Sequence, residues 1–237
     1  MTFLKDFTRE KFPSFFKIAK SSYYRINKLL LGKSESQIIF KKIYDNNIWG
    51  DPDSVSGTGS NLKNTEQVRK ELVTLIPKLN AQSFLDIPCG DFFWMKLVTL
   101  PVKKYIGADI VEELIRNNNK NFANDNRHFL VLDIINEPLP QVDIIFCRDC
   151  LAHLSFYNIK AAIKQIKKSN SKYLITSTYI EQELNSDLPT GRFRPINLEL
   201  YPFNFPKPVL LINDKCISGN MMLEDKSLGV WEISELP

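Results

Sequence analysis

Residues 83–95 read SFLDIPCGDFFWM, and the fold is best read outward from this stretch. An apolar run ends at Asp86, Pro88 and Gly90 interrupt it, and Asp91 opens a second apolar segment. The pattern predicts a buried strand, a tight turn and the start of a helix. In a doubly wound sheet, such a turn and the helix N-terminus behind it face the ligand crevice. With one glycine and a carboxylate at each end, this loop disfavours a pyrophosphate and suits a ligand that brings positive charge.

Purely local roles for these two acids remain an alternative. Asp91 is a good residue to cap a helix, and Asp86 can simply hydrogen-bond the turn. The residues that follow decide between the two interpretations.

The composition is that of a globular chain. Its 237 residues are 43% hydrophobic and 11% aromatic, which indicates one domain with an extension. No apolar run approaches the ~20 residues needed to cross a bilayer. Charged residues interrupt the N-terminus, so we expect no secretory signal. The four cysteines indicate buried thiols of a reducing compartment, hence a cytoplasmic location; they are Cys89, Cys147, Cys150 and Cys216.

The charge is unevenly distributed. Residues 1–48 contain ten Lys/Arg and four Asp/Glu, so this arm carries +6 and the rest of the chain −2. A mildly acidic body argues against nucleic acid as a partner of the core. The arm alternates cations with aromatic and aliphatic residues, a pattern typical of helices on an anionic membrane surface. Peripheral contact with the inner face of the membrane is therefore one expectation; packing against the chain's own domain, or against a second copy in a homodimer, is the other.

A loop rich in Gly, Ser, Asp and Asn occupies residues 45–65. Three of the nine glycines fall within it, and Trp49 anchors one end. We interpret it as an ordered lid over the ligand, with a plain linker as the alternative. Residues 1–60 are thus expected to form a basic helical extension with a lid, and residues 61–237 the main domain.

Beyond the lid, predicted helices and strands alternate. Helices are predicted over residues 64–78, 111–122 and 156–168, and further strands over residues 104–110, 127–134, 142–148 and 172–179. This alternation predicts an α/β fold with a parallel sheet built from right-handed crossovers.

An acid stands at the carboxyl end of each of four successive predicted strands: Asp86, Asp109, Asp133 and Asp149. An acid about twenty residues beyond the first loop is where a ribose diol is held, and Asp109 fills that place. Asp133, one strand further, is predicted to accept a hydrogen bond from an adenine amino group. One acid in a turn is common. Four of them at one sheet edge form a nucleoside-binding pattern.

The segments LDIPCGD (85–91), YIGADI (105–110), LVLDI (130–134) and DIIFCRDCLAHL (143–154) resemble class I S-adenosylmethionine-dependent methyltransferases. The resemblance covers about residues 60–180 well. It implies a Rossmann-like sheet of seven strands, five parallel strands and a C-terminal antiparallel hairpin, with helices on both faces. Residues 209–215 and 228–233 fit the hairpin.

The resemblance also implies S-adenosylmethionine as the cofactor. Asp86 and Gly90 are implied at its methionine part, Asp109 at the ribose, and Asp133 with Ile134 at the adenine. The full set of implied cofactor residues is Asp86, Pro88, Cys89, Gly90, Asp91, Trp94, Asp109, Ile110, Asp133, Ile134 and Arg148.

One departure from the family concerns the first loop. The family's loop is usually richer in glycine, whereas Pro88 and Cys89 stand here. This Pro-Cys-Gly-Asp-Phe-x-Trp variant resembles bacterial members found with surface-glycan genes.

A proline-rich segment, residues 180–208, follows the fifth predicted strand. An ordered loop of this length is uncommon in a compact domain unless it is functional. We interpret it as an acceptor-binding wall in which Arg192 or Arg194 grips a carboxylate or phosphate, with Asn197 and Trp49 also at the acceptor. A structural wrap held by aromatics and prolines is the alternative.

A hydroxyl acceptor needs a base to remove its proton. His153 lies four residues after Asp149, so both face one side of a helical turn. We expect His153 to act as the base and Asp149 to orient it, with a packing role for His153 as the alternative. Cys147, Cys150 and His153 also form a Cys-x2-Cys-x2-His run, but a closed zinc site needs four ligands, and we expect no metal.

These features predict a methyltransferase that acts on a hydroxyl of a sugar, a glycan precursor or a related polar metabolite, as in polysaccharide biosynthesis. An NAD(P)-dependent oxidoreductase is disfavoured, because no Gly-x-Gly-x-x-Gly follows the first strand. A non-catalytic cofactor-binding subunit is the other alternative.

Overall fold

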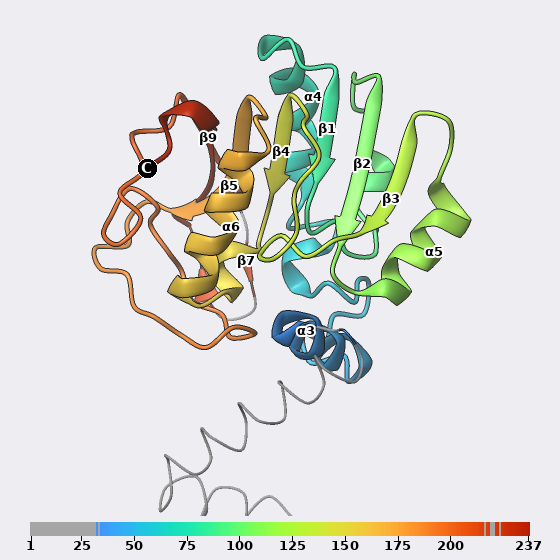
Figure 1. Ribbon diagram of the computed structural model, residues 1–237, viewed down its shortest axis with the longest axis horizontal. Coiled ribbons are helices and arrows are strands. Elements are labelled where there is room, and N and C mark those ends of the chain that lie inside the picture. Colours follow the sequence, from blue (N-terminus) through green and yellow to red (C-terminus); the bar gives the residue numbers. More distant parts are fainter. Residues whose placement is uncertain (1–31, 33, 216, 219–220, 223) are drawn as a thin grey trace, which may run out of the picture.

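The computed structural model describes residues 32, 34–215, 217–218, 221–222 and 224–237 (Figure 1). A seven-stranded sheet forms the centre of this part, in the order β3-β2-β1-β4-β5-β9-β6. The strands are β1 (Ser83–Asp86), β2 (Lys104–Asp109), β3 (Arg127–Val131), β4 (Ile144–Cys147), β5 (Tyr173–Tyr179), β6 (Leu210–Asn213) and β9 (Lys226–Glu232). Strands β1 to β5 are parallel, and β9 runs antiparallel between β5 and β6. The predicted fold class is confirmed, including the last strand inserted beside the fifth.

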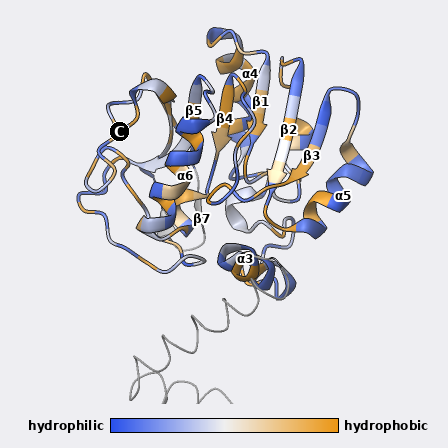
Figure 2. Ribbon diagram, viewed as in Figure 1, coloured by the Kyte–Doolittle hydropathy of each residue, from blue (hydrophilic) through white to orange (hydrophobic). Residues whose placement is uncertain are grey.

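Helices cover both faces of the sheet. The described helices are α3 (Glu35–Asp45), α4 (Glu66–Lys78), α5 (Glu112–Phe122) and α6 (Phe156–Lys168), with 3₁₀ turns η1 (Thr58–Ser60), η2 (Met95–Leu97), η3 (Leu151–His153) and η4 (Ile233–Glu235). A short pair, β7 (Ile217–Ser218) and β8 (Met221–Met222), lies in the connection between β6 and β9. The alternation of side chains along each strand splits the core: Leu85 and Ile145 pack with α6, and Phe84 and Ile144 pack with α4. Figure 2 shows the hydrophobic colouring of β1 and β4 at the centre.

The predicted helix after the first strand is wrong. Residues beyond β1 form turns, and the short η2 is the only regular piece of the segment. Phe92 adopts φ 58° and is 2% exposed, with its ring 5.5 Å from Tyr105 and 5.1 Å from Phe129 between centroids. Burial of this aromatic ring holds the chain in a left-handed conformation that no helix can start from.

The N-terminal extension is described only in part. Helix α3 begins at a capping box, in which the Ser34 side chain accepts from Gln37 N and Gln37 accepts from Ser34 N. The predicted membrane contact and homodimer concern the arm of residues 1–48, most of which lies outside the described residues, and both stay predictions. Within the described part, no helix combines the length and apolar character needed to span a bilayer.

Candidate functional site

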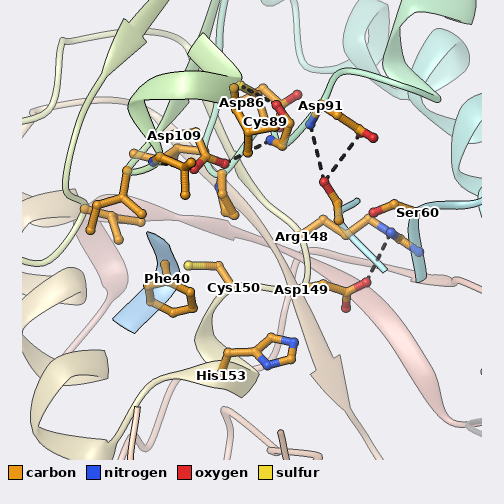
Figure 3. Close-up of a pocket in the computed structure, with 18 of the residues that line it drawn as sticks. Phe40, Ser60, Asp86, Cys89, Asp91, Asp109, Arg148, Asp149, Cys150 and His153 are labelled. Carbon is orange, nitrogen blue, oxygen red and sulfur yellow. Dashed lines mark hydrogen bonds and ion pairs between the residues drawn. The ribbon is translucent and has the colours of Figure 1, made fainter. Parts of the chain in front are cut away.

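A pocket opens at the carboxyl edge of the sheet, where α3 lies across the strand ends (Figures 1 and 3). Parallel strands place the residues that follow them at one edge, which is where ligands bind in open α/β sheets. Asp86, Asp109, Asp133 and Asp149 all line this pocket. The structure therefore brings the four predicted acids together.

Asp86 is a buried acid with no cation bonded to it in the described part of the chain. Its Oδ2 accepts a hydrogen bond from the Tyr105 hydroxyl, and the residue is 3% exposed. Burial raises the pKa of the Asp86 carboxyl to about 7, the Tyr105 hydrogen bond opposes this rise, and the nearby Asp109 adds to it. A cationic ligand in the pocket would relieve this cost.

Asp109 joins the first loop to the start of α5. Its Oδ2 accepts from Gly90 N at 3.0 Å, and its Oδ1 accepts from Val111 N at 2.9 Å. Burial raises the pKa of the Asp109 carboxyl to about 6, although these backbone hydrogen bonds lower it. Gly90 itself has φ 55°, and a Cβ there would lie 2.2 Å from Ser56 Oγ, so the loop can approach the lid this closely only at a glycine.

Asp91 caps no α-helix. Its carboxylate accepts from Ser54 Oγ at 2.9 and 3.0 Å and from Val55 N at 3.1 Å, while Ser56 Oγ lies 3.4 Å away. The residue therefore ties the loop before α4 to the loop after β1. Val55, Ser56 and Ser60 line the pocket, so this part of the glycine-rich segment lies beside the site, and its role as a lid stays a prediction.

Asp133 has a different environment from the one predicted. Its Oδ2 accepts from Ser34 Oγ at 2.7 Å, from Ser36 Oγ at 2.8 Å and from Asn136 Nδ2 at 2.7 Å, and its Oδ1 accepts from Ile135 N at 2.9 Å. A carboxylate that already accepts four hydrogen bonds has little capacity left for an adenine amino group. In this structure Asp133 docks the N-terminus of α3 over the pocket, and the neighbouring Ile134 lines the cavity.

Asp149 belongs to a group of four charges in which the other three are buried and its own side chain is 24% exposed. Arg148 Nη1 lies 3.1 Å and Lys226 Nζ 2.7 Å from its Oδ2, and the same two cations reach Asp214 Oδ2 at 2.9 and 3.0 Å. Burial opposes ionisation of Asp149, but the two cations outweigh it and hold the pKa of its carboxyl well below the usual range. Arg148 also donates to Gly59 O at 2.8 Å, which fixes η1 of the lid.

His153 is held between two aromatic rings, Trp49 at 4.8 Å and Phe193 at 5.4 Å between centroids. Its Nδ1 is buried and makes no hydrogen bond within the described residues. Burial lowers the pKa of the imidazole to about 4, although the charge of Asp149 opposes this fall. The ring is therefore uncharged at neutral pH. The predicted orienting hydrogen bond is not formed: Asp149 bonds to Lys226, Arg148 and Ser177 instead, and the two aromatic rings hold the imidazole.

The segment between β5 and β6 is held together by residues that were predicted to bind the acceptor. Arg194 donates to Ala152 O at 2.8 Å and to Ser186 O at 3.1 Å, and Asn197 donates to the carbonyls of Ile180 and Gln182. Arg192 is exposed, and none of these three residues lines the pocket. The structural-wrap alternative is thus the better account of Arg194 and Asn197. This segment contacts the site at His153, where the Phe193 ring packs on the imidazole and Gly191 N donates to His153 O at 2.8 Å.

Several pocket residues escaped the sequence reasoning because their contacts are non-local. Those supplied by α3 and the lid are Phe40, Ile43, Tyr44, Val55, Ser56 and Ser60. Lys226 does not line the pocket but pairs with Asp149, and it escaped as well, although a lysine in an apolar strand, opposite an acid on the other arm of a hairpin, is a usable signal. Five other residues line the pocket as predicted: Trp49, Pro88, Cys89, Trp94 and Ile110.

Cys147 and Cys150 are buried free thiols, and no cluster of three metal-ligating side chains occurs among the described residues.

Comparison with known proteins identifies the domain. Residues 85–172 match a family model described as a methyltransferase domain. The structure is similar to N-methyltransferase NodS from Bradyrhizobium japonicum WM9 in complex with S-adenosyl-L-homocysteine, at 14% identity and a TM-score of 0.53, covering 80% of this chain and 97% of that one. It is also similar to the methyltransferase domain of bacterial CtHen1, at 14% identity and a TM-score of 0.52, covering 73% of this chain and 100% of that one. At this identity the solved structures show the fold alone. A search among curated proteins finds no significant match.

The pocket residues suit S-adenosylmethionine. Asp86 and Asp109 are acids whose pKa values burial raises, and the cofactor carries a sulfonium and an ammonium that favour their charged forms. The first loop, the acids at the strand ends and the matched residues 85–172 coincide. The chain carries a methyltransferase domain over residues 85–172 and is an S-adenosylmethionine-dependent enzyme.

Proposed function

We propose that this enzyme methylates a hydroxyl group of a sugar, a glycan precursor or a related polar metabolite. The observation that carries the proposal is an enclosed, uncharged imidazole with an unbonded Nδ1, lining the same pocket as the acids that suit a cationic cofactor. Such a group can accept a proton from a hydroxyl acceptor during transfer.

The cofactor residues divide by their position in the pocket. We place Asp86 and Gly90 at the methionine end, since Asp86 is the more strongly perturbed acid and gains most from a positive charge. Asp109, at the end of β2, is placed at the ribose. Bound S-adenosylmethionine supplies an activated methyl group on a sulfonium. Positioning of donor and acceptor can then account for up to ~7–11 kcal/mol of the barrier.

His153 is suited to a hydroxyl acceptor even though burial weakens it as a base. When a methyl group is transferred to an oxygen, positive charge develops on that oxygen, and its proton becomes strongly acidic. A weak base in the correct protonation state is then sufficient. The rings of Trp49 and Phe193, tilted by 43° and 47° to the imidazole, hold it from two sides and take the place of an orienting carboxylate.

The acceptor end of the pocket combines an aromatic surface with oxygen groups. Trp49 and Phe40 contribute rings with centroids 6.1 Å apart, and Ser60 and Asp149 contribute a hydroxyl and a carboxylate. This combination suits a polyhydroxylated ring, whose C–H face packs on an indole while a hydroxyl donates to Asp149 Oδ1, since Arg148 and Lys226 lie against Oδ2. The choice of a sugar among polar acceptors rests further on the resemblance of residues 88–94 to glycan-associated members of the family.

Helix α3 and the lid close the pocket from the solvent side. Phe40, Ile43 and Tyr44 from α3 face Val55 and Ser56 from the lid around the cavity. A closed pocket excludes water, which would otherwise compete for the acceptor site.

The test is transfer of a labelled methyl group from the cofactor into an extract of cell-surface carbohydrates and polar metabolites. The proposal expects label in a carbohydrate ether that is stable to mild acid and base, and expects far less label with the His153→Ala variant. Label found only on nitrogen, or in protein or nucleic acid, would overturn the choice of a hydroxyl acceptor while leaving the methyltransferase assignment in place.

A further inference from the structure

The outward side of α6 carries four lysines that take no part in the reaction site: Lys160, Lys164, Lys167 and Lys168. Their spacing of four, seven and eight residues places them on one face of the helix. All four are exposed, and none forms an ion pair within the described part of the chain. Lys167 donates to Leu236 O, and no acidic side chain pairs with the other three. This lysine face is a concentrated, unneutralised positive surface.

A shallow groove of about 460 Å³ runs along the lysine face. Besides the four lysines, its lining is apolar: Ile163, Pro202, Phe203 and Pro237. The apolar stems of lysines can lie along such a floor while their charged ends reach outward.

Two exposed tyrosines flank this surface. Tyr157 is 82% exposed and lies in the same stripe of α6 as Lys160 and Lys164, three and seven residues away. Tyr201 is 78% exposed and directly precedes Pro202 of the groove. An exposed tyrosine is amphipathic, with an apolar ring and a polar tip, and such rings concentrate at the level of lipid headgroups.

We propose that the lysine face of α6, with its groove and flanking tyrosines, is a docking surface for an anionic phospholipid membrane. The charge complementarity is diffuse: the lysines are distributed over two turns of helix, as suits a plane of headgroups better than one acidic peptide. Residues 1–31 add seven Lys/Arg and only two Asp/Glu to the chain, interspersed with aromatic residues. Stable attachment to a membrane generally takes two signals, and the lysine face is the second.

The location of this surface links it to the reaction site. Helix α6 begins at Phe156, three residues after His153, and its N-cap Ser155 accepts from Asn158 N at 3.3 Å. The tyrosine end of the lysine face therefore starts next to the acceptor end of the pocket. Docking along α6 brings that end close to the lipid surface.

The test uses the full chain and vesicle co-sedimentation. The vesicles are phosphatidylcholine alone, or phosphatidylcholine in which a third is replaced by phosphatidylglycerol. The wild-type protein is expected to bind the anionic vesicles and not the neutral ones. The triple variant Lys160→Glu/Lys164→Glu/Lys168→Glu is expected to lose roughly 100-fold or more in partitioning, since each lysine near an anionic surface contributes about fivefold and each glutamate adds repulsion.

The matched control reverses three exposed lysines elsewhere, Lys78→Glu/Lys103→Glu/Lys120→Glu, which have no ion pair in the described residues. The control makes the same change in net charge and is expected to bind far better than the α6 variant. Near-ultraviolet circular dichroism and cofactor affinity confirm that both variants are folded. Absence of a preference for anionic vesicles, unchanged binding of the α6 variant, or an equal loss in both variants would each overturn the proposal.

Discussion

Asp86 shows how burial prepares a site for a cation. Burying an ionised carboxylate without a positive partner costs free energy, so its pKa rises and the group stays protonated up to a higher pH. The pKa of Asp86 rises to about 7 and that of Asp109 to about 6 for this reason. A ligand with a sulfonium and an ammonium restores the charged form, so protonation and cofactor binding compete.

Cofactor affinity is therefore expected to fall as the pH falls. Above about pH 7, Asp86 is ionised and can bind the cation directly. Below this pH, binding must release a proton, so each further pH unit lowers the cofactor affinity up to about tenfold. Titration calorimetry at about pH 6 in two buffers of different ionisation enthalpy should detect the released proton. The Asp86→Asn variant should bind more weakly at neutral pH and should lose the fall in affinity that begins near pH 7, keeping only the fall near pH 6 that Asp109 imposes. Affinity that stays constant from about pH 8 to pH 5 in the wild-type protein would contradict this account of Asp86.

His153 carries the second prediction at this scale. The His153→Ala and His153→Gln variants are expected to lower kcat by ~10²–10⁴ and to leave cofactor affinity unchanged. Because a base works in its deprotonated form and the pKa here is about 4, the histidine should impose no loss of kcat between about pH 5 and pH 8. Steady-state rates over this range check both statements. Equal turnover for His153→Ala and wild type would remove His153 from the chemistry.

Among the elements, α3 joins distant parts of the carboxyl edge. Its N-terminal Ser34 and Ser36 hold Asp133 after β3, and Lys41 pairs with Glu113 of α5 at 2.9 Å. At the other end, a Cβ on Gly191 would lie 2.7 Å from Ile39 Cγ2, so α3 also packs on the segment that carries Phe193. One short helix thus covers both the cofactor end and the acceptor end of the pocket.

The Ser36→Ala variant tests this docking and keeps the N-cap residue Ser34, although it also removes the contact between Ser36 Oγ and Ser34 Oγ at 2.8 Å. Loss of the buried hydrogen bond to Asp133 is expected to cost about 1–3 kcal/mol of α3 docking. Amide hydrogen exchange in α3 should speed up by roughly 5- to 100-fold, while the exchange of β1 and β4 stays slow. The exposed Thr74→Ala change on α4 serves as the control, and α3 exchange equal to that of this control would show that Asp133 does not hold the helix.

The hairpin of β6 and β9 contributes a buried cation to the site. Lys226 is 2% exposed and shares Asp149 and Asp214 with Arg148. The Lys226→Met variant leaves two buried acids with one cation, which is expected to destabilise the protein by ~3–5 kcal/mol. Urea unfolding measures this loss. Lys172→Met, which removes an exposed lysine from its pair with Asp143, should leave the free energy of unfolding nearly unchanged, and equal effects of the two substitutions would contradict the network.

At the scale of the whole molecule, the sheet could be predicted because its signals are local. Apolar runs that end in Asp86, Asp109 and Asp149 mark buried strands and place the acids at one edge, and the structure shows them around one pocket. The sequence predicts a helix after β1 that the structure lacks. That helix does not form because Phe92 packs among rings from other elements, which no local pattern shows.

The contacts that cover the site could not be predicted from the sequence either, because they also join residues that lie far apart in the chain. Ser36 and Asp133 are 97 residues apart, and Lys226 and Asp149 are 77 apart, so neither pair leaves a pattern in any local window. Arg194 looked like an acceptor ligand because arginine commonly grips anions, but it donates to carbonyl groups of its own loop. Only the packed chain shows which polar groups are already occupied.

The most direct test of the central claim is calorimetric titration of S-adenosylmethionine into the wild-type protein and into the Asp109→Ala variant, with NADH as the control ligand. The account predicts one molecule of S-adenosylmethionine bound per chain, at least roughly tenfold weaker binding to the variant, consistent with a lost charge-assisted hydrogen bond, and no binding of NADH. Normal binding of S-adenosylmethionine by Asp109→Ala, or preference for NADH, would contradict the assignment of the carboxylate-lined pocket.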